Sequence, residues 1–89
     1  MKNNLKILES WLGTCRKYYC KLSGAIGGND RLDLSFNIVP KDYVPINKYG
    51  TYNEPYDSFT ITVSHLEKYI QSQMEDLIYE INMEFKSRI

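Results

Sequence analysis

The stretch GGNDRLDLSFNI, residues 27–38, decides the fold because a tight-turn signal leads directly into the clearest strand pattern in the chain. Its first four residues are glycine, asparagine and aspartate, which tolerate the positive φ angles that tight turns require. Apolar residues then alternate with polar ones at Leu32, Leu34, Phe36 and Ile38. This period of two is typical of a strand with one buried face. We therefore predict a turn at residues 27–30 and a strand that Pro40 ends.

Two further alternating runs flank this strand. The run before the turn places Tyr18, Cys20, Leu22 and Ile26 against Lys17, Tyr19, Lys21 and Ser23. The run over residues 59–63 is rich in β-branched residues, and its apolar face carries Phe59, Ile61 and Val63. Together the runs predict a three-stranded antiparallel sheet that begins with a hairpin.

Residues 14–22 also fit a second interpretation. A single helix extending to Leu22 would align Leu5, Leu8, Leu12, Cys15, Tyr19 and Leu22 at spacings of three and four. It would hold Gly13 in its interior, which costs about 1 kcal/mol. We therefore rank the strand first, and expect a short helix over residues 4–12 that is capped by Asn3 or Asn4 and closed by Gly13.

A longer helix is expected at the end of the chain. Ser64 and Glu67 have the spacing of a capping box, which predicts a helix that begins at His65 and continues to about Arg88. Its core-facing stripe would contain Leu66, Ile70, Met74, Leu77, Ile78, Ile81 and Phe85. Such a helix would be about 36 Å long, so we expect its end to overhang the sheet. Tyr79 and Met83 lie opposite the stripe, where they would be available for a dimer contact with a second copy.

The predicted order is helix, strand, strand, long loop, strand and helix, an α+β fold (αβββα) in a single domain over residues 1–89. The chain is 43% hydrophobic and 25% charged, which are ordinary values for a chain that folds. Eleven basic and eleven acidic residues give no net charge, so no overall field attracts the protein to nucleic acid or membrane. No run reaches the ~18 apolar residues of a membrane span, and the start of the chain lacks a secretion-signal pattern. We expect a cytoplasmic protein without a membrane partner.

The residues that usually carry chemistry are few and scattered. The two cysteines, Cys15 and Cys20, would lie about 16 Å apart along a strand, too far for a disulfide or for one shared metal. His65 is the single histidine, and its expected place at a helix start makes it a poor proton carrier. The glycines match no phosphate-binding motif, and no acidic pair has the spacing of a general acid and base. We therefore expect no catalytic residues, no metal, no cofactor and no enzyme activity.

The loop sequence YVPINKYGTYNEPY, residues 43–56, holds half of the protein's eight tyrosines. A connection this long is usually functional or disordered, and its apolar content argues against disorder. One interpretation is that the loop folds over the open face of the sheet. The other is that it contacts a protein partner, because tyrosine offers a large area with few rotatable bonds. In that case the partner-binding residues are Tyr43, Tyr49, Tyr52, Glu54 and Tyr56.

A nucleic-acid-binding alternative ranks second. Arg16, Lys17, Tyr19 and Lys21 interleave basic and aromatic side chains along one predicted strand. Such a strand can contact phosphates while a ring stacks on a base. The two hypotheses differ in salt dependence, because phosphate contacts weaken steeply with ionic strength.

The segment YYCKLSG, residues 18–24, follows the predicted first helix and precedes the strand at 32–38. In this segment and in element order, the chain resembles a small phage-encoded anti-CRISPR family that inhibits Cas9. The resemblance implies a non-enzymatic inhibitor of a bacterial defence nuclease or regulator, acting in the host cytoplasm. That family is strongly acidic and mimics DNA, whereas this chain has no net charge. The resemblance therefore assigns no binding residues.

Overall fold

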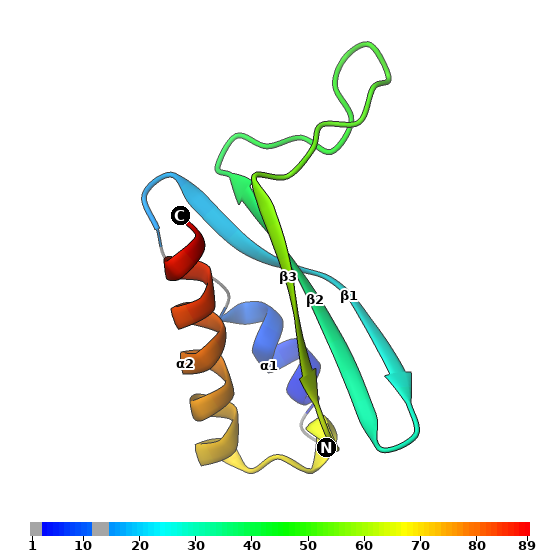
Figure 1. The fold of residues 1–89 in the computed structure, drawn as a ribbon, viewed down its shortest axis with the longest axis vertical. Coiled ribbons are helices and arrows are strands. Elements are labelled where there is room, and N and C mark those ends of the chain that lie inside the picture. The colour runs from blue at the N-terminus through cyan, green and yellow to red at the C-terminus, as the bar shows by residue number, and fades with distance from the viewer. Residues whose placement is uncertain (1–2, 12–14) are drawn as a thin grey trace.

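The computed structural model describes residues 3–11 and 15–89 and has the predicted α+β order (Figure 1). The elements are α1 (Asn4–Ser10), β1 (Tyr18–Gly28), β2 (Arg31–Pro40), β3 (Asp57–Val63), the 3-10 helix η1 (Leu66–Lys68) and α2 (Gln71–Arg88). The three strands form an antiparallel sheet in the order β1-β2-β3. Since Tyr18 to Leu22 lie in β1, the interpretation of these residues as helix is wrong. The expected helix end at Leu12 and closure at Gly13 lie outside the described residues.

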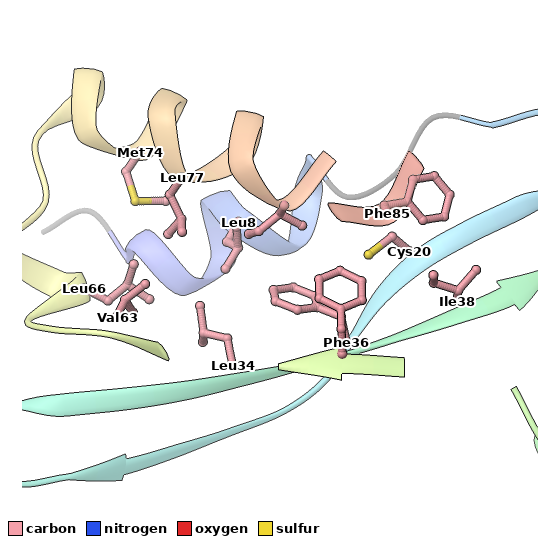
Figure 2. Close-up of a cluster of buried hydrophobic side chains, with 12 residues drawn as sticks. Leu8, Cys20, Leu34, Phe36, Ile38, Val63, Leu66, Met74, Leu77 and Phe85 are labelled. Carbon is pink, nitrogen blue, oxygen red and sulfur yellow. The ribbon is translucent and has the colours of Figure 1, made fainter. Parts of the chain in front are cut away.

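The core lies on one face of the sheet, beneath both helices (Figure 2). Phe36, at the middle of β2, pairs with Leu22 on β1 and with Phe59 on β3. The Phe36 and Phe59 rings stack with their centroids 5.1 Å apart. The helices contribute Leu8, Met74, Leu77, Ile81 and Phe85, all buried. The predicted alternation of residues 32–38 therefore matches the observed core.

A β-bulge changes the face of the second half of β1. The register of β1 against β2 shifts between Leu22 and Gly24. Because one extra residue reverses the direction of every following side chain, Ile26 lies opposite Asp33 and is 70% exposed. The prediction that Ile26 shares a buried face with Cys20 and Leu22 is therefore wrong.

Helix α2 begins later than predicted. His65 has a left-handed backbone with φ 55°, and its side chain caps nothing. The chain then forms η1, whose Leu66 is buried, before α2 starts at Gln71. At this start the Gln73 side-chain oxygen accepts a hydrogen bond from Ile70 N–H at 3.0 Å. The predicted capping box of Ser64 and Glu67 therefore does not form. The break between η1 and α2 lets Leu66 pack beside Val63 while α2 runs back along the sheet (Figure 2).

The two ends of α2 also differ from expectation. Ile70 precedes the helix and is 64% exposed, so it does not belong to the buried stripe. At the other end Phe85 is fully buried, and Arg88 donates hydrogen bonds to Glu84 and Asp57. The C-terminal end of the helix is therefore attached to the sheet and does not overhang it.

The N-terminal helix is joined to the rest of the core through Asn4. Asn3 is the N-cap, and its side-chain oxygen accepts from the N–H groups of Leu5 and Lys6. Asn4 is buried, and its Nδ2 donates to the carbonyls of Leu66 at 2.7 Å and Tyr69 at 3.1 Å. One amide thus fixes α1 against the segment that leads into α2.

Candidate protein-contact surface

The tyrosine loop, residues 41–56, extends beyond the end of the sheet (Figure 1). It leaves β2 after Pro40 and returns to β3 at Asp57. The molecule is accordingly elongated, with principal extents of 43 × 27 × 22 Å. The interpretation in which this loop covers the open face of the sheet is therefore wrong.

The tip of the loop is a small turn organised by Asn47. The Asn47 N–H donates to the Thr51 carbonyl at 3.0 Å, and its side-chain oxygen accepts from the N–H groups of Tyr49 and Thr51. Gly50 has φ +79°, a conformation that is costly for any residue with a Cβ. Ile46 and Tyr52 form a single antiparallel bridge across the base of this turn. The tip therefore has a defined backbone without belonging to the sheet.

The middle of the loop is closed by Asn53 and Tyr43. The Tyr43 hydroxyl donates to the Asn53 carbonyl at 2.6 Å. Asn53 in turn donates from its N–H to the Pro45 carbonyl and from Nδ2 to the Val44 carbonyl. Because its hydroxyl is used inside the loop, Tyr43 has a structural role in addition to any contact role.

Tyr56 connects the loop to the sheet. Its N–H donates to the Ile38 carbonyl at 2.8 Å, and its ring packs against Tyr18 with centroids 4.7 Å apart. The side chain nevertheless remains 54% exposed. Tyr18 and Tyr56 thus form the base from which the loop projects.

The most exposed rings lie at the tip. Tyr49 is 79% exposed and Tyr52 is 75% exposed. Val44 and Ile46 are also exposed nearby, as is Glu54. Lys48 lies 5.1 Å from the centroid of the Tyr49 ring. Since Lys41 and Lys48 balance Asp42 and Glu54, this surface is aromatic and carries no net charge.

The residues of the nucleic-acid alternative are also exposed. Arg16 and Lys17 precede β1, whereas Tyr19 and Lys21 belong to it and point to the same face. Lys41 lies 5.5 Å from the centroid of the Tyr19 ring. This cation adds positive charge but also occupies a ring face that a base would need for stacking.

The remaining reactive side chains do not form one site. Cys15 and Cys20 are both free thiols, and burial raises the pKa of Cys20 to about 11. His65 Nε2 lies 3.8 Å from Asp30 Oδ1 on the surface. Within residues 3–11 and 15–89, no three His, Cys, Asp or Glu side chains are grouped to hold a metal ion. None of the described helices has the length and apolar character needed to cross a membrane.

A second surface contains Tyr79, which the sequence analysis names with Met83 as a dimer contact, but its groove and the part that α1 plays in it were not predicted. An apolar groove of about 770 Å³ lies between α1 and α2, with the exposed side chains of Trp11 and Tyr79 on its lining. Tyr79 and Met83 are 67% and 53% exposed, as expected from their position opposite the core stripe. Ile70, which the helical spacing places in the core-facing stripe, instead lines this groove and is exposed.

Comparison with known protein families, curated proteins and solved structures gives no match. The segment YYCKLSG occupies the first part of β1. Cys20 and Leu22 pack in the core, Tyr18 packs on Tyr56, and Gly24 lies at the bulge. Most of the segment thus has a structural role.

Proposed function

We propose that this protein is a non-enzymatic binding module whose target is another protein and whose contact surface is the tip of the tyrosine loop. The observation that carries this proposal is the exposure of Tyr49 and Tyr52 on a loop held by its own hydrogen bonds. Tyrosines of this kind are typical centres of protein interfaces. Because the tip is already ordered, binding would cost less conformational entropy than closing a free loop.

The absence of net charge on the tyrosine loop as a whole favours a protein over a nucleic acid as the target. A phosphate backbone is bound mainly through Lys and Arg, and here two lysines are balanced by two acidic residues. The flanking Val44 and Ile46 add apolar area, which suits a desolvated contact. Glu54 would lie at the rim of such a contact.

We further propose that the module acts as an inhibitor that occludes a surface of a bacterial defence or regulatory protein. Two considerations support this proposal: the resemblance of residues 18–24 to an anti-CRISPR family, and the shape of a projecting loop that fits a concave site. The inhibitor would use aromatic rings in place of DNA-like negative charge, since the chain is neutral.

The test is affinity capture from bacterial lysate with the wild type and with the double variant Tyr49→Ala, Tyr52→Ala. The matched control is Tyr19→Ala, which instead removes an exposed ring from the residues of the nucleic-acid alternative. We expect the loop variant to lose its partner while the control keeps it, with similar capture at about 50 and 200 mM salt. Equal recovery by all three proteins would refute the contact role of the loop. If capture instead falls steeply between about 50 and 200 mM salt, and Tyr19→Ala also loses the partner, the target is a nucleic acid.

A further inference from the structure

The groove between α1 and α2 is distinct from the tyrosine loop. It is lined by Asn4, Ile7 and Trp11 of the N-terminal segment and by Tyr69, Ile70, Gln71, Met74, Glu75, Ile78, Tyr79 and Asn82. Trp11, Ile70 and Tyr79 are 63%, 64% and 67% exposed. Large apolar side chains that are exposed side by side mark a contact site more often than isolated ones do.

The residues that line the groove are spaced as in a surface against which a helix packs. The α2 positions recur at spacings of three and four residues, from Gln71 to Asn82, and Asn4, Ile7 and Trp11 recur in the same way. Two helices that each present one face to a groove can receive a third helix between them. The groove thus fits an α-helix that carries apolar side chains.

The charges along α2 favour a second copy of the same helix in the antiparallel direction. Glu75, Tyr79 and Lys86 lie on one face, since four and seven residues separate them. Glu75 and Lys86 are exposed, and neither forms an ion pair with a described residue. A two-fold contact centred between Tyr79 and Asn82 places each Glu75 opposite Lys86 of the other copy. A parallel arrangement would instead place like charges together.

The dimensions of the α1 and α2 face and the net charge of the chain are compatible with a second copy bound in the groove. The 18 residues of α2 are about 27 Å long, and with α1 alongside they form a face about 20 Å wide. A face of these dimensions is at most about 540 Å², smaller than the roughly 800 Å² per partner of a standard interface, so the dimer would be weak and reversible. Two copies also do not repel each other over long range, because the formal net charge is zero.

We propose that this groove is one half of a two-fold homodimer interface, in which α2 of each copy packs antiparallel against α2 and α1 of the other. Trp11 and Tyr79 of the groove lining are its main apolar contacts, the exposed Met83 lies one turn after Tyr79 at its edge, and two Glu75 to Lys86 pairs fix its direction. The tyrosine loop lies beyond the opposite end of the molecule from the start of α2 (Figure 1). Each dimer would therefore present two free loops, and dimer formation does not depend on the proposed function of the loop.

Sedimentation velocity from the low micromolar to the millimolar range tests the assembly. We expect a reversible change from the 10.5 kDa monomer to twice that mass. Tyr79→Ser should raise the dissociation constant about tenfold or more. Tyr19→Ser removes another exposed tyrosine and should leave it unchanged. The loop double variant should also dimerise normally, which separates this result from a failure of the proposed function.

Charge reversal tests the direction of packing. Glu75→Lys alone and Lys86→Glu alone should each dissociate the homodimer, because each places like charges together twice. An equimolar mixture of the two variants should dimerise again, since both ion pairs are then restored. A chain that carries both substitutions should also recover. Failure of the mixture to assemble would overturn the antiparallel arrangement.

Trp11 gives an independent signal, because it is the single tryptophan in the chain. Its emission should shift to shorter wavelength as protein concentration rises and the ring becomes buried, and Tyr79→Ser should abolish the shift. A wild type that stays monomeric at all concentrations would overturn the proposal. So would a groove that binds lipid vesicles or an added amphipathic peptide while the protein remains a monomer.

Discussion

Arg88, at the end of α2, donates a hydrogen bond to the carboxylate of Asp57, the first residue of β3, at 3.1 Å. The same guanidinium donates to Glu84 at 2.8 Å and to the Ser58 carbonyl at 3.3 Å. It also lies 5.3 Å from the centroid of the Phe59 ring. Since Asp57 directly follows the tyrosine loop, this contact joins the C-terminal helix to the base of the proposed contact surface.

This contact predicts a specific acid sensitivity. The Ser58 N–H, followed by Arg88, holds the pKa of Asp57 below its ordinary value of 3.8. A carboxyl group whose pKa is lower in the folded state stabilises the protein at pH values above its ordinary pKa. This stabilisation is lost as the pH falls through the folded-state pKa. Asp57→Asn should therefore flatten the decline of the thermal midpoint below about pH 4. A decline as steep as that of the wild type would contradict this role.

Asp33 provides a second acid-sensitive site and explains why Asp57→Asn should not remove the whole effect. A hydrogen bond from the Thr62 hydroxyl at 2.6 Å, with Arg31 beside it, lowers the pKa of Asp33. The control is Asp42→Asn in the exposed loop, which should leave the pH profile unchanged. The double variant Asp33→Asn, Asp57→Asn should show the weakest acid dependence of the set.

The buried amide of Asn4 predicts a loss of stability on substitution. Asn4→Ala removes the side-chain donor to the carbonyls of Leu66 and Tyr69, of which Leu66 still accepts from the Tyr69 N–H, at a cost of about 1–3 kcal/mol in the free energy of unfolding. Asn4→Asp should cost more at neutral pH, because a carboxylate would face two carbonyl oxygens. Since protonation restores a donor, stability of this variant should rise as pH falls. Urea denaturation at two pH values measures both effects. An Asn4→Ala variant with the same free energy of unfolding as the wild type would contradict the role of the amide.

The two thiols should differ in reactivity towards an aromatic disulfide reagent. Backbone hydrogen bonds at Lys17 and Tyr18 lower the pKa of Cys15, whereas burial raises that of Cys20 to about 11. Because the thiolate is the reactive form, Cys15 should react quickly and Cys20 only as the fold opens. Cys15→Ser should remove the fast phase and Cys20→Ser the slow one. Equal rates for the two thiols would show that β1 does not protect Cys20.

The central strand and the face of α2 could be predicted because their patterns are repeated over many residues. Leu34, Phe36 and Ile38 alternate without interruption, and all are fully buried. The bulge after Leu22 depends on one inserted residue, which a period count does not register. The Ser23 and Gly24 pair was the local signal, since glycine in a strand often marks a bulge.

Other features depend on contacts between distant residues. Ser64 and Glu67 match a capping box, but the burial of Leu66 against α1 decides where the helix begins. Likewise, the composition of the tyrosine loop indicated a surface of interest but not its direction. That direction follows from bonds such as Tyr43 to Asn53, which join residues inside the loop and leave the sheet uncovered.

The bulge can be tested with two isoleucines of the same hairpin. Ile38 on β2 is fully buried, whereas Ile26 on β1 is 70% exposed. Ile38→Ala should lower the free energy of unfolding by about 2–5 kcal/mol. Ile26→Ala should change it by less than about 0.5 kcal/mol. Comparable losses in urea denaturation would mean that Ile26 faces the core, as an unbulged strand would require.

The order of the loop tip should depend on Gly50. Its φ of +79° makes an alanine there strained by about 1 kcal/mol or more, although no atom lies within 4 Å of the added Cβ. Because the tip can open without unfolding the sheet, Gly50→Ala should speed amide hydrogen exchange at Asn47 and Thr51, whose bonds define the turn, and lower the thermal midpoint by a few degrees at most. Gly28→Ala is the matched control, because its site is equally open and has no positive φ. If the tip is the contact surface, Gly50→Ala should also weaken capture of the partner and Gly28→Ala should not. Unchanged exchange at Asn47 and Thr51 would show that the tip is not held in this conformation.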